Sequence, residues 1–191
     1  MDLCPKNRKV EVTMLKEIFY TTCQQRVLYF LLAHPDQKYY DREISRLVRA
    51  GRASTNYALR SLIEAGFVER EKRGRMYFYA VNTEDPIIRQ LKITQNLIDI
   101  RPLADKLKDI SLKIVLYGSS ATGANHARSD IDLFILTRDI KKVKDIIYKS
   151  PLKEKLQHVI TTPQDFIKLK KDNPVFYKEV SMGIVIHEKK R

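Results

Sequence analysis

Two aspartates separated by a single residue, Asp130 and Asp132, interrupt an apolar segment and constrain the fold more than any other feature of this chain. The segment SDIDLFIL, residues 129–136, alternates and then becomes fully apolar, which predicts a β-strand. Residues two apart on a strand share a face, so the two carboxylates would lie together, partly shielded from water. Such a pair is unfavourable unless a cation lies between them, so both residues are candidate metal ligands. The alternative is a solvated strand end that tolerates two acids.

The net charge of +13 on 191 residues favours an anionic partner such as nucleic acid or nucleotide. Both halves of the chain carry more Lys and Arg than Asp and Glu, so the excess is not confined to one tail. The alternative is a Lys-rich surface that maintains solubility. The length allows one or two domains, each large enough to bury a core.

The sequence predicts a cytoplasmic protein without membrane contact. The longest apolar stretch, residues 27–33, is too short to span a bilayer, and the N-terminus has no signal-peptide core. Cys4 and Cys23 show no metal-binding or redox spacing, and two thiols are compatible with a reducing compartment.

Helical patterns and then strand patterns follow one another in the first 82 residues. The first helix is expected to end before Pro35, because the residue preceding a proline disfavours helix. Gly51 is predicted to form the turn between the next two helices. A Lys-Arg-Gly turn between two strand patterns is a hairpin signal. The predicted helices cover residues 11–33, 42–49 and 52–65, and the predicted strands cover 67–72 and 75–81.

This order, together with the phrase STNYALRSLIEAGFVEREKRGRMYFYAVN, resembles the small transcriptional repressors with a winged helix-turn-helix. The resemblance covers about residues 15–82 and implies binding of double-stranded DNA, commonly as a homodimer. RNA, or use as a protein-binding platform, remain alternatives. The residues expected to contact DNA lie on the second helix of the pair and at the hairpin tip: Arg52, Ser54, Asn56, Tyr57, Arg60, Lys72, Arg73 and Arg75.

The pattern changes after a helical stretch over residues 85–110 that Pro102 is expected to interrupt. Strand and helix patterns then alternate to the end of the chain, which is typical of an α/β-type domain. The fold class is therefore α+β: a winged helix-turn-helix over residues 1–84, a connector helix over 85–110, and an α/β domain with a small mixed sheet over 111–191.

Gly118 and Ser119 end an apolar strand, and Asp130 and Asp132 follow at the spacing of the nucleotidyltransferase superfamily related to DNA polymerase beta. The phrase GSSATG…SDIDL resembles the minimal members of that superfamily over about residues 110–187. The resemblance implies a nucleoside triphosphate held by Gly118, Ser119 and Ser129, with Mg²⁺ or Mn²⁺ bound by the catalytic aspartates 130 and 132. Oxygen ligands of this kind suit such hard cations, and glycine allows close approach of a phosphate.

One position departs from that family pattern. A third carboxylate is expected on the strand LQHVIT, residues 156–161, which offers Gln157 and His158 instead. Neither replaces a Mg²⁺-bound carboxylate easily. Two functions therefore stay open: a DNA-binding regulator whose second domain binds Mg-nucleotide with weak catalysis, or an active nucleotidyltransferase. The active enzyme would modify a protein or RNA acceptor, including an antitoxin-type role, and would use the winged helix for docking.

Overall fold

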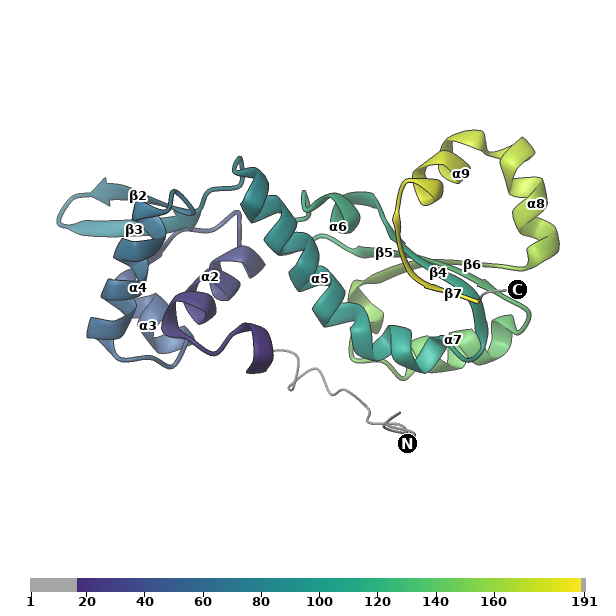
Figure 1. Cartoon of the computed structure of the whole chain (residues 1–191), viewed down its shortest axis with the longest axis horizontal. Helices are drawn as coiled ribbons and strands as arrows, with labels where there is room; N and C mark the ends of the chain where they lie inside the picture. The colour runs from purple at the N-terminus through teal and green to yellow at the C-terminus, as the bar shows by residue number, and fades with distance from the viewer. Residues whose placement is uncertain (1–16, 190–191) are drawn as a thin grey trace, which may run out of the picture.

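The computed structural model describes residues 17–189, and its N-terminal part combines helices α2, α3 and α4 with an antiparallel sheet of order β1-β3-β2 (Figure 1). Fully buried aliphatic side chains, among them Val27, Leu31 and Ile44, fill the space between the helices and the sheet. The elements are α2 (Cys23–Ala33), β1 (Tyr39–Tyr40), α3 (Asp41–Leu47), α4 (Arg52–Glu64), β2 (Val68–Arg73) and β3 (Met76–Val81).

The helix predicted over residues 11–33 is wrong in its central part, because residues 20–22 are not helical and α2 begins at Cys23. The side chain of Thr22 accepts a hydrogen bond from the backbone N–H of Gln25, whose side chain accepts one from the N–H of Thr22. This reciprocal capping box satisfies the N–H groups of a new helix start. Residues 11–16 lie outside the described part of the chain.

The turn between α3 and α4 is made by Arg49 and not, as predicted, by Gly51. Arg49 has a φ of 52°, whereas Gly51 has an ordinary φ of −63° and is the N-cap of α4. The N–H of Ala50 donates to the carbonyl of Ser45, and the N–H of Arg49 donates to that of Arg46. This is the hydrogen-bond pattern of a Schellman motif, which places its left-handed residue directly after the C-cap.

Helix α5 (Pro86–Leu107) connects the two parts of the molecule, and the predicted interruption at Pro102 does not occur. Proline removes one intrahelical hydrogen bond, but Ile98, Ile100 and Leu103 are all buried around it. Burial of these side chains keeps the helix continuous through the proline. Within residues 17–189, none of the helices has the length and apolar character needed to cross a membrane.

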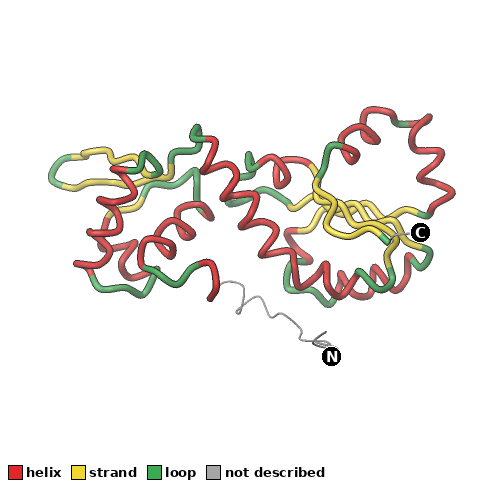
Figure 2. The backbone as a smooth tube through the Cα atoms, viewed as in Figure 1, coloured by secondary structure: helices red, strands yellow, loops and turns green. Residues whose placement is uncertain are grey.

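The C-terminal part contains a mixed four-stranded sheet of order β6-β5-β4-β7, in which only β5 and β6 run parallel. Helices α5 and α7 cover one face, and α8 and α9 cover the other, so the sheet is the middle layer (Figure 2). The elements are β4 (Ser111–Tyr117), α6 (Gly118–Thr122), β5 (Ile131–Thr137), α7 (Ile140–Tyr148), β6 (Leu156–Thr161), α8 (Pro163–Asp172), α9 (Pro174–Ser181) and β7 (Ile184–Glu188). The chain as a whole has a mixed α+β architecture.

Candidate functional site

Asp132 is the second residue of β5, at the end of the strand where β4 stops, whereas Asp130 lies directly before β5 and is exposed, outside the strand expected to include it. Tyr117, the last residue of β4, is paired with Asp132 across the antiparallel ladder. The chain then turns at Gly118, whose φ is +65°, into the short helix α6. The predicted glycine and the predicted aspartate therefore meet in space, because the strand pairing brings the end of one strand to the start of the other.

Gly118 and Asp132 are in close contact. A Cβ atom built on Gly118 would lie 2.3 Å from Oδ2 of Asp132 and 3.1 Å from its Cγ. Real Cβ atoms do not approach other heavy atoms so closely, so glycine is required here for its size as well as for its positive φ. The carboxylate of Asp132 therefore lies directly against the backbone of Gly118, where no side chain intervenes.

The electrostatics of Asp132 favour a cation. Burial raises the pKa of its carboxyl, and the nearby carboxylates of Glu179 and then Asp130 raise it further. Burial, and then the carboxylates of Asp132 and Glu179, raise the pKa of Tyr117 to about 12. Burial is the largest cause of both shifts, and a bound cation would offset the smaller part that comes from the neighbouring carboxylates.

Glu179 was missed by sequence reasoning. It lies on α9, far along the chain from the two aspartates, and no spacing rule points to it. Its neighbour Val180 is buried against Tyr117 and Phe134, and this contact places the last turn of α9 over the end of β4. Only the packing of α9 on the sheet brings this acid to the site.

The strand register settles which residue of β6 shares a face with the aspartates. Gln157 is paired with Asp132, whereas His158 is paired with Leu133 on the opposite face. His158 lines a cavity with α7 residues that include Lys144 and Tyr148. The position that the family resemblance reserves for a third acid is therefore Gln157, a neutral side chain.

The residues present fit a divalent ion that takes part of its coordination from a ligand. Among residues 17–189, no three His, Cys, Asp or Glu side chains are grouped closely enough to hold a metal ion by themselves. Two carboxylates on one strand face supply part of an octahedral oxygen set, and Mg²⁺ commonly completes such a set with phosphate oxygens and water. Asp130 and Asp132 as metal ligands stay a prediction.

The loop between α6 and β5 contains the remaining predicted nucleotide contacts. Ser119 is partly exposed in the first turn of α6. Ser129 lies at the other end of the loop, where its hydroxyl oxygen accepts a hydrogen bond from the N–H of His126 at 2.8 Å. This bond closes a local turn, so Ser129 already has a structural role, and its contact with a nucleotide remains untested.

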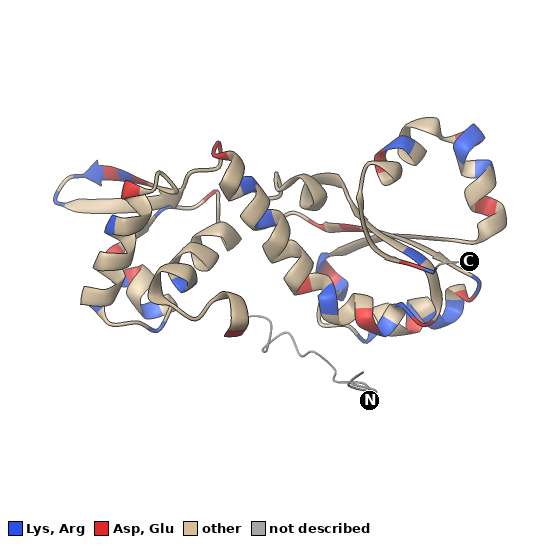
Figure 3. Cartoon of the chain, in the orientation of Figure 1, with Lys and Arg blue, Asp and Glu red and all other residues tan. Residues whose placement is uncertain are grey.

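A groove with a volume of about 760 Å³ separates α4 from the β2–β3 hairpin in the N-terminal part. Figure 3 shows Lys and Arg on α3, α4 and the hairpin around it. Asp41 is the one acid in its lining, and it accepts a hydrogen bond from Arg52. The basic residues in the lining are Arg42, Arg52, Arg60, Arg70 and Arg75.

Sequence reasoning identified three of these five arginines and missed Arg42 and Arg70. Arg70 pairs with Tyr79 on the inner face of the hairpin, and its guanidinium lies 4.5 Å from the ring centroid of Tyr77. The alternation of β2 could have revealed Arg70, since Val68 two residues earlier is a core residue. Arg42 is exposed on α3, and no pattern distinguishes it.

The other predicted DNA contacts are distributed around this groove. Asn56 lines it, whereas Ser54 and Tyr57 are exposed on α4. Lys72 is paired with Tyr77 on the groove side of the hairpin. Arg73 lies on the opposite face, where its guanidinium donates two hydrogen bonds to Glu71.

Comparison with known proteins identifies the C-terminal part. Residues 99–191 match the sequence model of the family described as "Polymerase beta, Nucleotidyltransferase". A solved structure described as a "possible transcriptional regulator from Methanosarcina mazei Go1" is 18% identical, with 57% of this chain and 91% of that chain covered and a TM-score of 0.33. No curated protein matches the chain. Residues 99–191 are therefore a domain of the polymerase beta nucleotidyltransferase type.

Proposed function

We propose that this chain is a DNA-binding regulator whose nucleotidyltransferase-type domain binds a nucleoside triphosphate with Mg²⁺. The observation that carries the proposal is the arginine-lined groove beside α4 in the same chain as the Gly118–Asp132 contact. Five guanidinium groups against one carboxylate make the groove suited to a phosphate backbone. The C-terminal site offers the residue types that suit a metal-bound triphosphate.

The N-terminal part acts in this proposal as a winged helix-turn-helix. Helix α4 enters the major groove, and the β2–β3 hairpin is the wing. Asn56 and Arg60 lie on the groove side of α4, and amide and guanidinium groups read adenine and guanine respectively. Arg70 faces them from the hairpin and contacts the phosphate backbone.

Replacing Arg60 with Ala should weaken binding to a specific duplex by about 1–3 kcal/mol, because a bidentate base contact is lost. Replacing Arg70 with Ala should weaken binding to all duplexes alike and lower the salt slope by about one unit, because one phosphate contact is lost. Fluorescence anisotropy over a salt series, with duplexes selected by the protein and scrambled controls, measures both effects.

Arg73→Ala is the matched control, because Arg73 has the same charge on the same hairpin but faces away from the groove. Its effect should be smaller than that of Arg70→Ala. An equal loss for the two variants would place the DNA across the hairpin tip. Unchanged affinity for every duplex in all three variants would show that this part of the chain is not a DNA-binding module.

In the C-terminal domain, the roles follow from position. Gly118 leaves the backbone open to phosphate, and Ser119 supplies a hydroxyl donor. Asp130 and Asp132 hold Mg²⁺, or Mn²⁺ in its place. When bound, the ion would supply positive charge at the phosphates. Tyr117 and Gly118 keep Asp132 in place from the neighbouring strand.

The alternative is an active nucleotidyltransferase, and Gln157 is the observation that bears on it. Gln157 occupies the same-face position beside Asp132, and a neutral amide there weakens binding of a second metal ion. We therefore expect slow or absent transfer. Incubation with labelled nucleoside triphosphates and Mg²⁺ or Mn²⁺, with label followed into the protein, co-purifying protein and RNA, measures it. Rapid transfer by the unmodified chain would favour the enzyme.

A further inference from the structure

A second cavity lies on the face of the C-terminal sheet opposite the aspartates. It has a volume of about 390 Å³, within the range of small-molecule sites, between α5, the loop at residues 125–129 and the segment that leads from α7 to β6. Ile131, the residue between the two aspartates, faces this cavity and belongs to the core that α5 and α7 cover. A ligand in this cavity would therefore contact β5 on the face of the sheet opposite the Gly118–Asp132 site.

Lys92 is the most unusual residue of this cavity. Its side chain is only 5% exposed, and its ammonium donates one hydrogen bond, to the carbonyl of Leu32 at 2.6 Å. The described residues give it no ion pair within 4 Å, although an ammonium has three donors. Burial lowers the pKa of Lys92 to about 8, and the more distant Asp36 acts in the opposite direction. A buried cation with two unused donors is costly unless an anion or water meets them.

The other charged residues around the cavity are mostly positive, as Lys92 is. Lys106 and Lys155 are exposed at its edge, and His126 lies on the loop. Asp99 is the one acid in the lining, and it accepts a hydrogen bond from the hydroxyl of Tyr29. The lining therefore carries an excess of positive charge.

The adjacent cavity that Lys92 also lines is different. It has a volume of about 420 Å³ and includes two acids, Asp36 and Glu84, with Glu84 paired to Arg89 at 3.2 Å. Its acids and bases are nearly balanced. An anion near Lys92 would therefore occupy the first cavity.

The walls of the first cavity add a surface for a ring. Pro102, Leu103, Ile131 and Leu152 supply apolar contact, and Gln95, whose amide donates to the carbonyl of Tyr29, lies beside them. Asn96 and Asn125 bond to each other, and Asn96 also donates to the carbonyl of Ser120, so this wall is fixed. An apolar wall beside a buried ammonium suits a ligand that combines a flat ring with an anionic group, such as a nucleotide.

We propose that this cavity binds a nucleoside monophosphate, with the phosphate at Lys92 and with the exposed lysines at the edge adding positive potential, independently of the metal site. This site is separate from the proposed triphosphate site, because the β-sheet lies between them. The ligand would touch Ala33 at the end of α2, α5 and the loop that leads to Asp130, which are elements of both parts of the chain.

Isothermal titration of the full chain with AMP and GMP in EDTA tests the proposal. Binding should be seen without metal and should be unchanged in an Asp130→Asn, Asp132→Asn double variant. Adenosine should bind at least tenfold more weakly than AMP, because the charged hydrogen bonds to the phosphate are missing. Lys92→Met should reduce the affinity for AMP by about tenfold or more for the same reason.

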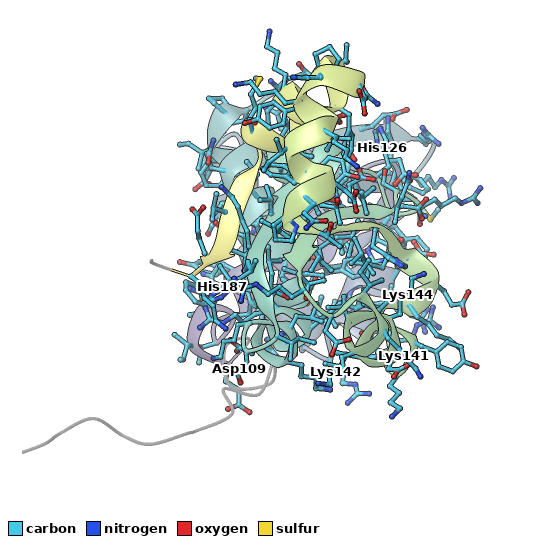
Figure 4. All side chains as sticks on the ribbon, turned by 90° about the vertical axis from the view of Figure 1, so that its right-hand side faces the viewer. Asp109, His126, Lys141, Lys142, Lys144 and His187 are labelled. Atoms are coloured by element: carbon cyan, nitrogen blue, oxygen red, sulfur yellow. The ribbon has the colours of Figure 1, made fainter. Side chains whose placement is uncertain are left out.

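Two further variants separate binding from folding. Lys92→Met also removes the bond to the carbonyl of Leu32, so its melting temperature must be measured alongside. A Lys106→Gln, Lys155→Gln double variant changes only exposed side chains and should lower the affinity several-fold. Lys141→Gln is the control, since Lys141 lies on α7 with Lys142 and Lys144, well apart from His126 (Figure 4).

Three results would overturn the proposal. The first is no heat of binding for AMP or GMP up to millimolar concentration. The second is binding that needs metal or disappears in the double Asp variant, which would place the ligand at the Gly118–Asp132 site. The third is binding that neither Lys92→Met nor the double lysine variant weakens. The first and third leave the proposed triphosphate site untouched.

Discussion

Replacing Gly118 with Ala should abolish stabilisation of the protein by Mg²⁺ with a nucleoside triphosphate. The new methyl group would lie 2.3 Å from Oδ2 of Asp132, so the carboxylate or the β4–α6 turn must move. The φ of +65° adds backbone strain for any residue with a Cβ atom. Both effects act on the atoms proposed to hold the metal and the phosphates. Thermal melting with and without Mg-triphosphate measures the loss.

Gly74→Ala is the matched control. Gly74 has a nearly equal φ of +61° at the hairpin turn, but no atom lies within 4 Å of the added Cβ. This variant should show only the cost of the backbone conformation, about 1 kcal/mol, and should keep the full response to Mg-triphosphate. A normal nucleotide response in Gly118→Ala would contradict the assignment of this turn to the binding site.

Changing Asp130 and Asp132 together to Asn should remove the metal-dependent stabilisation while leaving the free protein equally or more stable. The wild type should gain about 2.7 kcal/mol at a ligand concentration one hundred times the dissociation constant. The double variant should gain almost nothing, because amide oxygens are weak ligands for Mg²⁺. Its own stability should not fall, because the burial of a charge and the repulsion by Glu179 and Asp130, which raise the pKa of Asp132, are both removed.

Melting of the wild type and of the double variant should be measured with each of the four nucleoside triphosphates and with both Mg²⁺ and Mn²⁺. Asp139→Asn is a control for a carboxylate outside the site, at the N-cap of α7. It should keep the nucleotide response and change the stability of the free protein little, because Asn caps a helix about as well as Asp. An unchanged melting temperature of the wild type in every combination would remove the metal and nucleotide assignment.

The Arg-lined groove and the Lys92 cavity differ in how visible they are in the sequence. Arg52, Arg60 and Arg75 follow from the expected helix and hairpin, because local periodicity places them on exposed positions. Arg70 could have been found from the alternation of β2, and its pairing with Tyr79 shows that it lies on the groove side of the hairpin. Lys92 looks like any lysine on a helix, and only the packing of α2 against α5 buries it.

The boundaries of the elements show the same division. Helix α4 and the strands β2, β3, β5 and β6 lie within a few residues of their predicted ranges, since apolar period and terminal residues are local properties. The break at Thr22, the turn at Arg49 and the continuity of α5 through Pro102 were not predicted. The first two depend on hydrogen-bond motifs, a capping box and a Schellman motif. The third depends on buried side chains around Pro102, whose packing outweighs the low helix propensity of proline.

The sequence by itself singled out the aspartate pair, because the two-residue period of the expected strand would place Asp130 and Asp132 on one face without any long-range information. The resemblance of this motif to the minimal nucleotidyltransferases also predicted the nucleotidyltransferase-type domain, which the family match to residues 99–191 confirms. Only the tertiary structure decided that Gln157, and not His158, shares their face, since strand register depends on how β6 pairs with β5. Only the packing of α9 brought Glu179 to Asp132, because contacts between distant segments are set by the fit of buried side chains such as Val180, which no local pattern records.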